Sequence, residues 1–269
     1  MEFTTLIDNI VYGEVLTAEH GLSFLVKAHN KTILFDTGQT GAILKNAEYL
    51  DEDLETVDYV VLSHGHYDHC GGLESFLSIN SKAKVFMKSK AIEDKFRKDY
   101  KSIGFKLQKK ISDYPNEFIF IDEDTEIAPG VWLMADICQY RDSFSSNESL
   151  FIKIDNHYVS DPFQDELFML IEESGKNHLF TGCSHKGILN IIKTASEALS
   201  GAPIETVAGG MHINTGILNE IDGYLNQFDS LNVKNLFVNH CTGIEGYFKL
   251  RSNLSLNVHY AFTGFKYSE

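Results

Sequence analysis

Residues 63–72 read SHGHYDHCGG, and this stretch decides how the whole chain is interpreted. His64 and His66 stand two residues apart, at the end of the apolar run 57–63. In an extended chain, residues i and i+2 point to the same side, so both imidazoles can reach one cation. Asp68 and His69 follow, where the chain turns toward two glycines. This pattern predicts a site for one or two divalent metal ions, against the plainer interpretation of a His-rich surface loop.

Imidazole and carboxylate ligands together suit zinc, iron, manganese or nickel better than calcium. We expect zinc first, with manganese, iron, nickel or magnesium as alternatives. A divalent ion acidifies a bound water and stabilises charge on an ester. The expected activity is therefore metal-dependent hydrolysis.

Further ligands are expected from three strand–loop–helix units in the last third of the chain. The predicted strands are 177–182, 204–210 and 234–239, and the predicted helices are 186–199, 219–228 and 244–252. Ligands in α/β sheets bind outside the carboxyl ends of strands, so the loops around 64–69, 183–185, 210–212 and 239–241 are expected to converge. His185 and His240 are the best additional ligand candidates. Cys183 is either a ligand or a small buried residue, and His212 is a ligand, a proton donor, a phosphate contact or a structural residue.

Upstream of these units, the pattern predicts a hairpin of the apolar runs 22–28 and 31–38, then a helix over 40–50 and a strand over 57–63. A helix is expected to start near 71, where Gly71 and Gly72 allow a tight bend. A strand at 84–88, a charged helix near 89–101 and several strands between 117 and 173 should follow. Asp36 is expected to orient the histidine-bearing turn, and His20 is more simply explained as a surface residue than as a neighbour of the site.

The formal net charge is −15, which argues against nucleic-acid binding because an acidic surface repels phosphate. Residues 88–110 nevertheless carry nine basic and three acidic side chains, a local charge of +6. This segment is interpreted as a solvated helix with pairs such as Glu93–Arg97, with attraction of an anionic substrate as the alternative.

The four cysteines form no C-x-x-C pair, which fits a reducing compartment. No apolar run approaches the length of a membrane span, and the first residues show no signal-peptide pattern. We therefore expect a cytoplasmic protein with a small anionic substrate, no membrane partner and an oligomeric state that the sequence does not define. In the absence of repeats or a linker, residues 1–269 are interpreted as one domain.

The residues ILFDTG at 33–38 and HGHYDH at 64–69 resemble the metallo-β-lactamase superfamily over essentially the whole chain. The resemblance implies an α+β four-layer αβ/βα sandwich with a metal site. The implied metal ligands are His64, His66, Asp68, His69, Cys183, His185 and His240, and the candidate catalytic residues are Asp68 and His212.

Five further stretches resemble a narrower branch, named for a dihydropterin-6-methyl-aminobenzene-phosphate synthase: AEHGLSFLV, SHGHYDHCGGL, FTGCSHKGILNII, AGGMH and NHCTG. The branch implies a synthase acting on a pterin and an aminobenzene phosphate as one alternative to hydrolysis. A thioesterase or lactonase, a redox enzyme and a metal-binding scaffold are the others.

The chain departs from the superfamily at one ligand position. The strand that usually ends in a bridging Asp here ends in HLFTGC, which places Cys183 there with His185 after it. The resemblance therefore leaves open a single metal ion in place of two.

Overall fold

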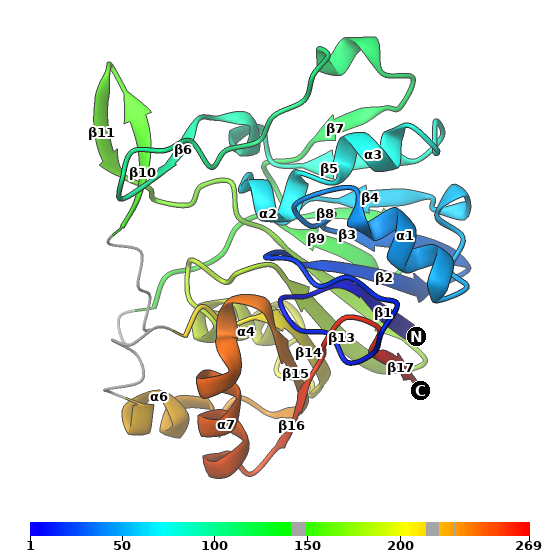
Figure 1. The fold of residues 1–269 in the computed structure, drawn as a ribbon. Coiled ribbons are helices and arrows are strands. Elements are labelled where there is room, and N and C mark those ends of the chain that lie inside the picture. Colours follow the sequence, from blue (N-terminus) through cyan, green and yellow to red (C-terminus); the bar gives the residue numbers. More distant parts are fainter. Residues whose placement is uncertain (141–148, 214–220, 229) are drawn as a thin grey trace. The chain divides into compact units, whose positions relative to one another are not determined.

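A computed structural model describes residues 1–140, 149–213, 221–228 and 230–269 (Figure 1). The chain forms two compact units, each discontinuous in sequence. The first unit comprises Met1–Asp122, Asn147–Glu166 and Phe262–Glu269, and the second comprises Glu123–Ser146 and Leu167–Ala261. The interpretation of residues 1–269 as one domain stays a prediction.

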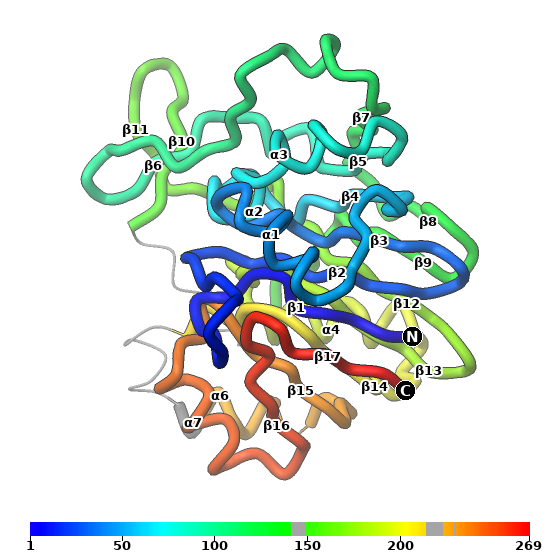
Figure 2. The backbone as a smooth tube through the Cα atoms, turned by 45° about the vertical axis from the view of Figure 1, so that its right-hand side comes forward, coloured from blue at the N-terminus to red at the C-terminus, as the bar shows by residue number. Residues whose placement is uncertain are grey.

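The first unit is built on a seven-stranded sheet in the order β17-β1-β2-β3-β4-β5-β7. Its strands are β1 (Glu2–Ile7), β2 (Ser23–Ala28), β3 (Lys31–Phe35), β4 (Tyr59–Val61), β5 (Lys84–Met87), β7 (Phe118–Phe120) and β17 (Lys266–Ser268). Strands β17, β1, β2 and β3 pair antiparallel, whereas β3, β4, β5 and β7 pair parallel. The tube in Figure 2 shows both ends of the chain beside each other on β1 and β17.

The predicted hairpin between β2 and β3 is confirmed. The strands pair from Phe24 with Phe35 to Ala28 with Lys31. His29 and Asn30 form the two-residue turn with φ values of 50° and 58°. Positive φ at both central residues is the signature of the type I′ turn, whose twist matches that of antiparallel strands.

Helices cover one face of this sheet. They are α1 (Ala42–Tyr49), α2 (Tyr67–Cys70) and α3 (Leu73–Leu77), with short 3₁₀ turns η1 (Leu54–Thr56), η2 (Ser89–Ile92) and η3 (Ile111–Asp113). Ile43 of α1 and Phe76 of α3 pack with Leu25, Leu34 and Val60 of the sheet in one fully buried cluster. Each buried side chain of this size contributes about 1.5–3 kcal/mol, so the apolar face of the sheet fixes where the helices lie.

The prediction of a charged helix near 89–101 is wrong. After η2 the chain runs into β6 (Lys95–Arg97), which joins a three-stranded sheet with β10 (Leu150–Ile154) and β11 (His157–Ser160). Lys90 pairs with Glu93 and Arg97 with Asp99, in place of the pairs expected for a helix. Lys95 is only 2% exposed, so the segment is not a uniformly solvated face.

The second unit has its own seven-stranded sheet in the order β16-β15-β14-β13-β12-β9-β8. Its strands are β8 (Thr125–Ala128), β9 (Val131–Met134), β12 (Phe168–Glu173), β13 (Lys176–Thr181), β14 (Ile204–Gly210), β15 (Val233–Asn239) and β16 (Asn257–Tyr260). Strands β13 to β16 run parallel to one another. The three predicted units are confirmed here in their order of strand and helix, because a helix follows each of β13, β14 and β15. Residues 214–220, between β14 and the helix after it, lie outside the described residues.

The helices of this unit are α4 (Ile188–Ala198), α6 (Ile221–Phe228) and α7 (Gly243–Asn253), and η4 (His240–Thr242) precedes α7. Residues 219 and 220 of the predicted helix 219–228 lie outside the described residues. Ile191 and Ile192 of α4 and Tyr224 of α6 join Val207 and Leu236 in the core. The first unit therefore combines a seven-stranded and a three-stranded sheet with helices, and the second unit combines one sheet with helices. The predicted α+β class is confirmed.

Within the described ranges, the structure contains no helix of the length and apolar character that a membrane span requires.

Glu52 ties three strands of the first unit together, and its contacts predict a pH-dependent stability. It accepts hydrogen bonds from Thr4 of β1 at 2.9 Å, Lys27 of β2 at 2.7 Å and Lys266 of β17 at 3.0 Å. Burial raises the pKa of the Glu52 carboxyl, but the bonds from Lys27, Lys266 and Thr4 outweigh it and leave the pKa lowered. A carboxyl with a lowered folded-state pKa stabilises the fold above its unfolded pKa of about 4.3, and this stability is lost as pH falls further.

Replacement of Glu52 by Gln is therefore expected to lower the free energy of unfolding by about 1–3 kcal/mol at neutral pH. The difference from the wild type should shrink as pH falls below about 4. Urea unfolding at several pH values measures it, with Glu48→Gln on exposed α1 surface as the control. A difference that stays constant with pH would contradict the assignment.

Candidate metal centre

The histidine-bearing turn follows β4 and brings two imidazoles together, as the i, i+2 spacing predicts. His64 Nε2 lies 3.0 Å from His66 Nδ1, and both side chains are buried. The His64 ring also lies 4.2 Å from the His69 ring, between centroids. Three imidazoles are thus held in one small, water-poor volume.

Asp36, at the end of β3, holds this turn in place, as the sequence predicts. Its carboxylate accepts the Ser63 backbone N–H and the Ser63 hydroxyl, both at 2.7 Å. The same carboxylate lies 2.6 Å from His69 Nδ1, and both residues are fully buried. A carboxylate is an acceptor only, so His69 carries its proton on Nδ1 and presents Nε2 as the lone-pair nitrogen.

Asp68 lies next to that nitrogen. Its Oδ2 atom is 4.0 Å from His69 Nε2 and 3.1 Å from His20 Nε2. His20 is largely exposed but reaches the carboxylate from the segment before β2, which favours the alternative that it is a neighbour of the site. Imidazole nitrogens and one carboxylate oxygen together match the donor set of zinc, iron or manganese.

The buried histidines are held in the form that binds metal. Burial lowers the pKa of His66 to about 4 and lowers that of His64 well below its usual range, with the neighbouring His69 adding to the effect on His64. Metal ligation requires neutral imidazole, so at neutral pH no proton has to be removed from either ring first.

Glycines in and after the turn are required by close backbone approach. A Cβ at Gly65 would lie 2.0 Å from the Ala91 carbonyl oxygen of η2. A Cβ at Gly71 or Gly72 would lie 2.2 Å from Gln39 O or 2.1 Å from Thr37 O. Gly71 and Gly72 both have helical backbone angles, so the expectation that they permit a tight bend is wrong. They allow the loop after β3 to pack directly on the turn.

A buried ion cluster that the sequence did not suggest supports the turn from the other side. Lys95 Nζ lies 2.9 Å from Asp161 Oδ2 and 2.6 Å from Asp165 Oδ1. Asp165 Oδ2 accepts the Gly65 backbone N–H at 2.8 Å. The cluster therefore fixes the residue between His64 and His66. Residues 161–165 lie far from β6 in the sequence, and no local pattern connects the two segments. The sequence therefore did not predict this ion cluster.

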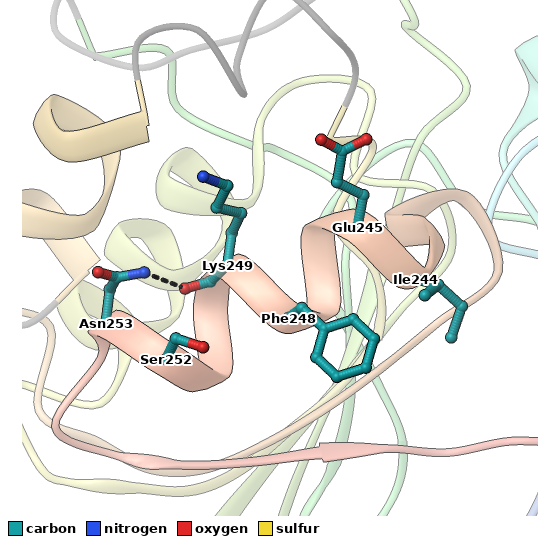
Figure 3. Close-up of a pocket in the computed structure, with 6 residues that line it drawn as sticks. All are labelled: Ile244, Glu245, Phe248, Lys249, Ser252 and Asn253. Atoms are coloured by element: carbon teal, nitrogen blue, oxygen red, sulfur yellow. Dashed lines mark hydrogen bonds between the residues drawn. The ribbon is translucent and has the colours of Figure 1, made fainter.

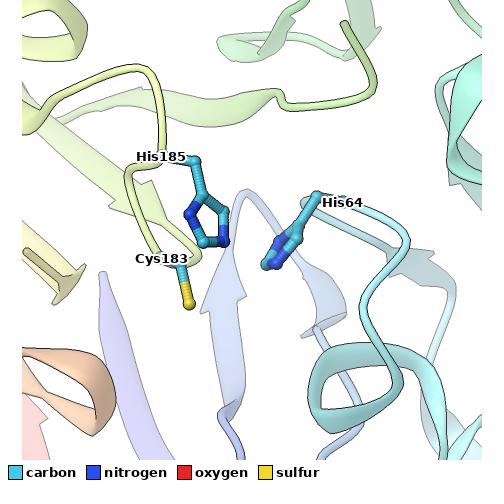
Figure 4. A group of neighbouring side chains, drawn as sticks. All are labelled: His64, Cys183 and His185. Carbon is cyan, nitrogen blue, oxygen red and sulfur yellow. The ribbon is translucent and has the colours of Figure 1, made fainter. Parts of the chain in front are cut away.

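The second unit places its own candidate residues at one edge of its sheet. Cys183 and His185 follow β13, His212 follows β14, and His240 and Cys241 follow β15. These three strands are parallel neighbours, so their carboxyl ends meet at one edge. Figure 4 shows Cys183 and His185 projecting from the single loop after β13, and it also draws His64 of the first unit.

Contacts within this edge are close. The His185 and His212 rings lie 4.5 Å apart between centroids. His212 and His240 have φ values of 45° and 49°, and Ser184 has 62°. Positive φ is uncommon outside glycine and marks strained backbone, which is concentrated at functional sites.

Cys241, the residue after His240, also belongs to this group. Burial raises the pKa of the Cys241 thiol, but hydrogen bonds with Cys183 and His212 outweigh it and lower the pKa well below its ordinary value. The signal that would have found Cys241 is its place two residues past the end of β15, the same place that Cys183 holds after β13.

The four candidate loops are not all at the edge of one sheet, so the premise that one sheet edge carries all of them is wrong. The loop at 64–69 belongs to the sheet of the first unit, and the other three belong to that of the second. A sequence pattern places a loop at a strand end but does not say which sheet the strand joins.

A separate shallow pocket lies along α7 and is lined by Ile244, Glu245, Phe248, Lys249, Ser252 and Asn253 (Figure 3). It contains no histidine or cysteine. Its polar groups are partly used within the helix, since Asn253 Nδ2 donates to the Lys249 carbonyl oxygen at 2.8 Å. We assign it no chemistry.

The fold and the histidine-bearing turn define the class: the chain belongs to the metallo-β-lactamase superfamily. The superfamily model matches residues 16–135, which include Asp36 and the turn. The chain is 32% identical over 254 residues to the protein MJ0448 of Methanocaldococcus jannaschii, covering 91% of this chain and 92% of that protein.

Two further relatives indicate the branch. The chain is 25% identical over 257 residues to 7,8-dihydropterin-6-methyl-4-(beta-D-ribofuranosyl)-aminobenzene-5'-phosphate synthase of Methanocaldococcus jannaschii, covering 90% of this chain and 87% of that protein. The crystal structure of Tm1679, described as a metal-dependent hydrolase of the β-lactamase superfamily, is 28% identical. It matches 100% of this chain and 99% of its own with a TM-score of 0.87. The predicted resemblance and the predicted metallo-β-lactamase fold are both confirmed.

Proposed function

We propose that this protein is a divalent-metal-dependent hydrolase that acts on a small anionic phosphate ester or phosphodiester. The proposed ligands are His64, His66, Asp68, His69, Cys183, His185 and His240, for one or two ions. Zinc is the proposed metal, with manganese, iron, nickel and magnesium as the alternatives to be compared. The proposed location is the cytoplasm.

One observation carries the proposal. Asp36 sets the tautomer of buried His69, so that Nε2 is directed away from the carboxylate and toward the side of Asp68. A carboxylate on the far nitrogen of an imidazole is the usual support of a metal-ligating histidine. A histidine that only filled the core would not need a fully buried carboxylate partner.

The roles of the protein's own residues follow from these contacts. A bound divalent cation supplies Lewis-acid activation of water and of the ester. Asp36 and Ser63 keep the turn rigid, and Asp68 offers an oxygen that accepts a proton, in contact with His20. His212 is proposed to donate a proton to, or hydrogen-bond with, the departing oxygen.

The relatives support the substrate class. Tm1679 is described as a hydrolase, and the name of the synthase from Methanocaldococcus jannaschii contains a 5'-phosphate. The first supports the hydrolase part of the proposal, and the second alone supports a phosphate-bearing substrate. The second candidate function, a synthase acting on a pterin and an aminobenzene phosphate, is favoured by the match to that synthase over 257 residues.

The test combines metal content with turnover. The full chain, purified without added metal, is analysed by mass spectrometry and assayed with bis(4-nitrophenyl) phosphate. We expect one or two equivalents of metal, phosphodiester turnover that a chelator abolishes, and recovery with zinc or manganese. His66→Ala should lower turnover and metal affinity by at least about 100-fold, because loss of a ligand exceeds the effect of losing an outer partner.

Cys138→Ala, at an exposed cysteine, is the matched control and should behave as wild type. Turnover of a thioester or lactone in place of the phosphodiester would move the assignment to those esters. Pterin binding without hydrolysis, seen as a change in pterin fluorescence, would favour the synthase. If neither the wild type nor the reconstituted protein held metal, the hydrolase proposal would fall.

A further inference from the structure

Three side chains at the edge of the second sheet lie close enough to share one ion. Cys183, His212 and Cys241 each offer a ligand atom, and these atoms all lie within 4.8 Å of one another. They follow three neighbouring parallel strands, β13, β14 and β15. All three belong to one unit, so the group is defined by the second unit alone.

The three loops that carry these side chains are tied to each other by hydrogen bonds. Gly210 N–H donates to Gly182 O at 2.8 Å, and Ser184 Oγ donates to Gly210 O at 2.6 Å, which joins the loops after β13 and β14. Met211 N–H donates to Thr242 Oγ1 at 2.9 Å, which joins the loops after β14 and β15. The spacing of the group is therefore set by the backbone, and little ordering remains to be done when an ion binds.

The Cys241 sulfur occupies a place that the backbone keeps open for it. The His212 backbone N–H donates to Cys241 Sγ at 3.3 Å, and Cys241 Sγ lies 3.5 Å from the Cys183 carbonyl oxygen. A Cβ at position 210 would lie only 2.5 Å from Cys241 Sγ. Any residue other than glycine at this position would displace the sulfur.

Two sulfurs and one imidazole form a soft donor set. Thiolate ligands select zinc, cadmium or copper(I), whereas magnesium, calcium and manganese prefer oxygen ligands. Three protein ligands leave a fourth tetrahedral position for water or a substrate atom, as in catalytic zinc sites. The group therefore fits a thiophilic cation.

We propose that Cys183, Cys241 and His212 form a binding site for a thiophilic divalent cation of the zinc type, with Cys241 as a ligand. The proposal rests on the proposed function in one respect, since Cys183 is a ligand in both. It adds Cys241, gives His212 the role of a ligand in place of the contact with the departing oxygen proposed above, and excludes magnesium and manganese from this position.

The test counts sulfur ligands spectroscopically. The full chain is reduced, stripped with chelator and titrated with cadmium ions, and the ultraviolet absorbance of cadmium–thiolate bonds is recorded. Wild type should give the amplitude of two thiolates, and excess magnesium should not compete. Cys241→Ala and Cys183→Ala should each keep about half the amplitude, whereas Cys138→Ala should keep all of it. His212→Ala should keep the amplitude, because both sulfurs remain. It should weaken cadmium binding by more than about 100-fold, which is the upper limit for loss of a residue that only supports a ligand.

Folding is checked by circular dichroism, and Cys241→Ser replaces Cys241→Ala if the alanine variant is unfolded. Full amplitude in a folded Cys241 variant would overturn the proposal. The proposal would also be overturned if Cys183 and Cys241 stayed joined in a disulfide after treatment with reductant, because the protein would then give no cadmium–thiolate absorbance. A normal cadmium signal without phosphodiester turnover would overturn the hydrolase proposal but support this cation site. Phosphodiester turnover together with no contribution of Cys241 to the cadmium signal would support the hydrolase proposal and overturn this cation site.

Discussion

Replacement of Lys95 by Met is expected to lower the free energy of unfolding by about 3–5 kcal/mol. Lys95 is 2% exposed and lies between Asp161 and Asp165, at 2.9 and 2.6 Å. Removal of the ammonium group leaves two buried carboxylates facing each other without a cation. Breaking a buried ion pair costs far more than an exposed one, because the remaining charge has no water to solvate it.

The charges within the cluster explain the size of the effect. Burial alone would lower the pKa of the Lys95 ammonium, but Asp165 and Asp161 outweigh it and raise the pKa above its ordinary value. Burial raises the pKa of Asp161 even with Lys95 beside it. The lysine therefore stays charged at neutral pH, and the carboxylates depend on it.

Urea unfolding of wild type and variant measures this effect. Lys101→Met is the matched control, because Lys101 is 72% exposed and its partner Asp99 lies 3.6 Å away. The control should change the free energy of unfolding by less than about 0.5 kcal/mol. The double variant Lys95→Met/Asp161→Asn should recover part of the loss. A loss below about 1 kcal/mol for Lys95→Met would mean that the cluster is not the support of the turn.

Replacement of Asp36 by Asn is expected to weaken metal binding by about 10- to 100-fold. The amide keeps the shape of the carboxylate, and asparagine tolerates the φ of 56° that this residue adopts. The amide oxygen can still accept the Ser63 backbone N–H. The amide NH₂ group then faces His69 Nδ1. That nitrogen must then act as the acceptor, so the proton moves to Nε2, the nitrogen proposed to bind metal.

Competition with a fluorescent zinc chelator measures the affinity. Asp122→Asn is the control, since Asp122 is exposed and accepts bonds from Ser89 at 3.2 and 3.0 Å. The variant should remain folded by circular dichroism while its affinity falls. Unchanged affinity in a folded Asp36→Asn protein would show that His69 does not bind metal through Nε2.

Local patterns were enough to predict much of the fold. The β2–β3 hairpin followed from two apolar runs separated by a turn that accepts positive φ at His29 and Asn30. The three parallel strand–loop–helix units followed from buried strands that end at Cys183, His212 and His240. The contact between His64 and His66 followed from their spacing alone. In each case the cause lies within a few residues.

The errors have non-local causes. The charged segment at 89–101 was expected to be a helix, but burial of Lys95 against Asp161 and Asp165 is decided by residues more than sixty positions away. Gly71 and Gly72 were explained by their own backbone, although the loop after β3 determines them. His20 gave no signal because its partner, Asp68, lies beyond an intervening hairpin and helix.

The pairing of β1 with β17 has a consequence for how the protein is made. Residues 2 and 268 are register partners, so one edge of β1 stays open until residue 268 has left the ribosome. At ordinary rates of synthesis this takes roughly 10 to 50 s. Residues 3–7 of β1 are all buried in the finished fold, and an uncovered apolar edge invites pairing with other chains. The nascent chain therefore passes through a long interval in which a chaperone, or pairing with another nascent chain, competes with its last strand.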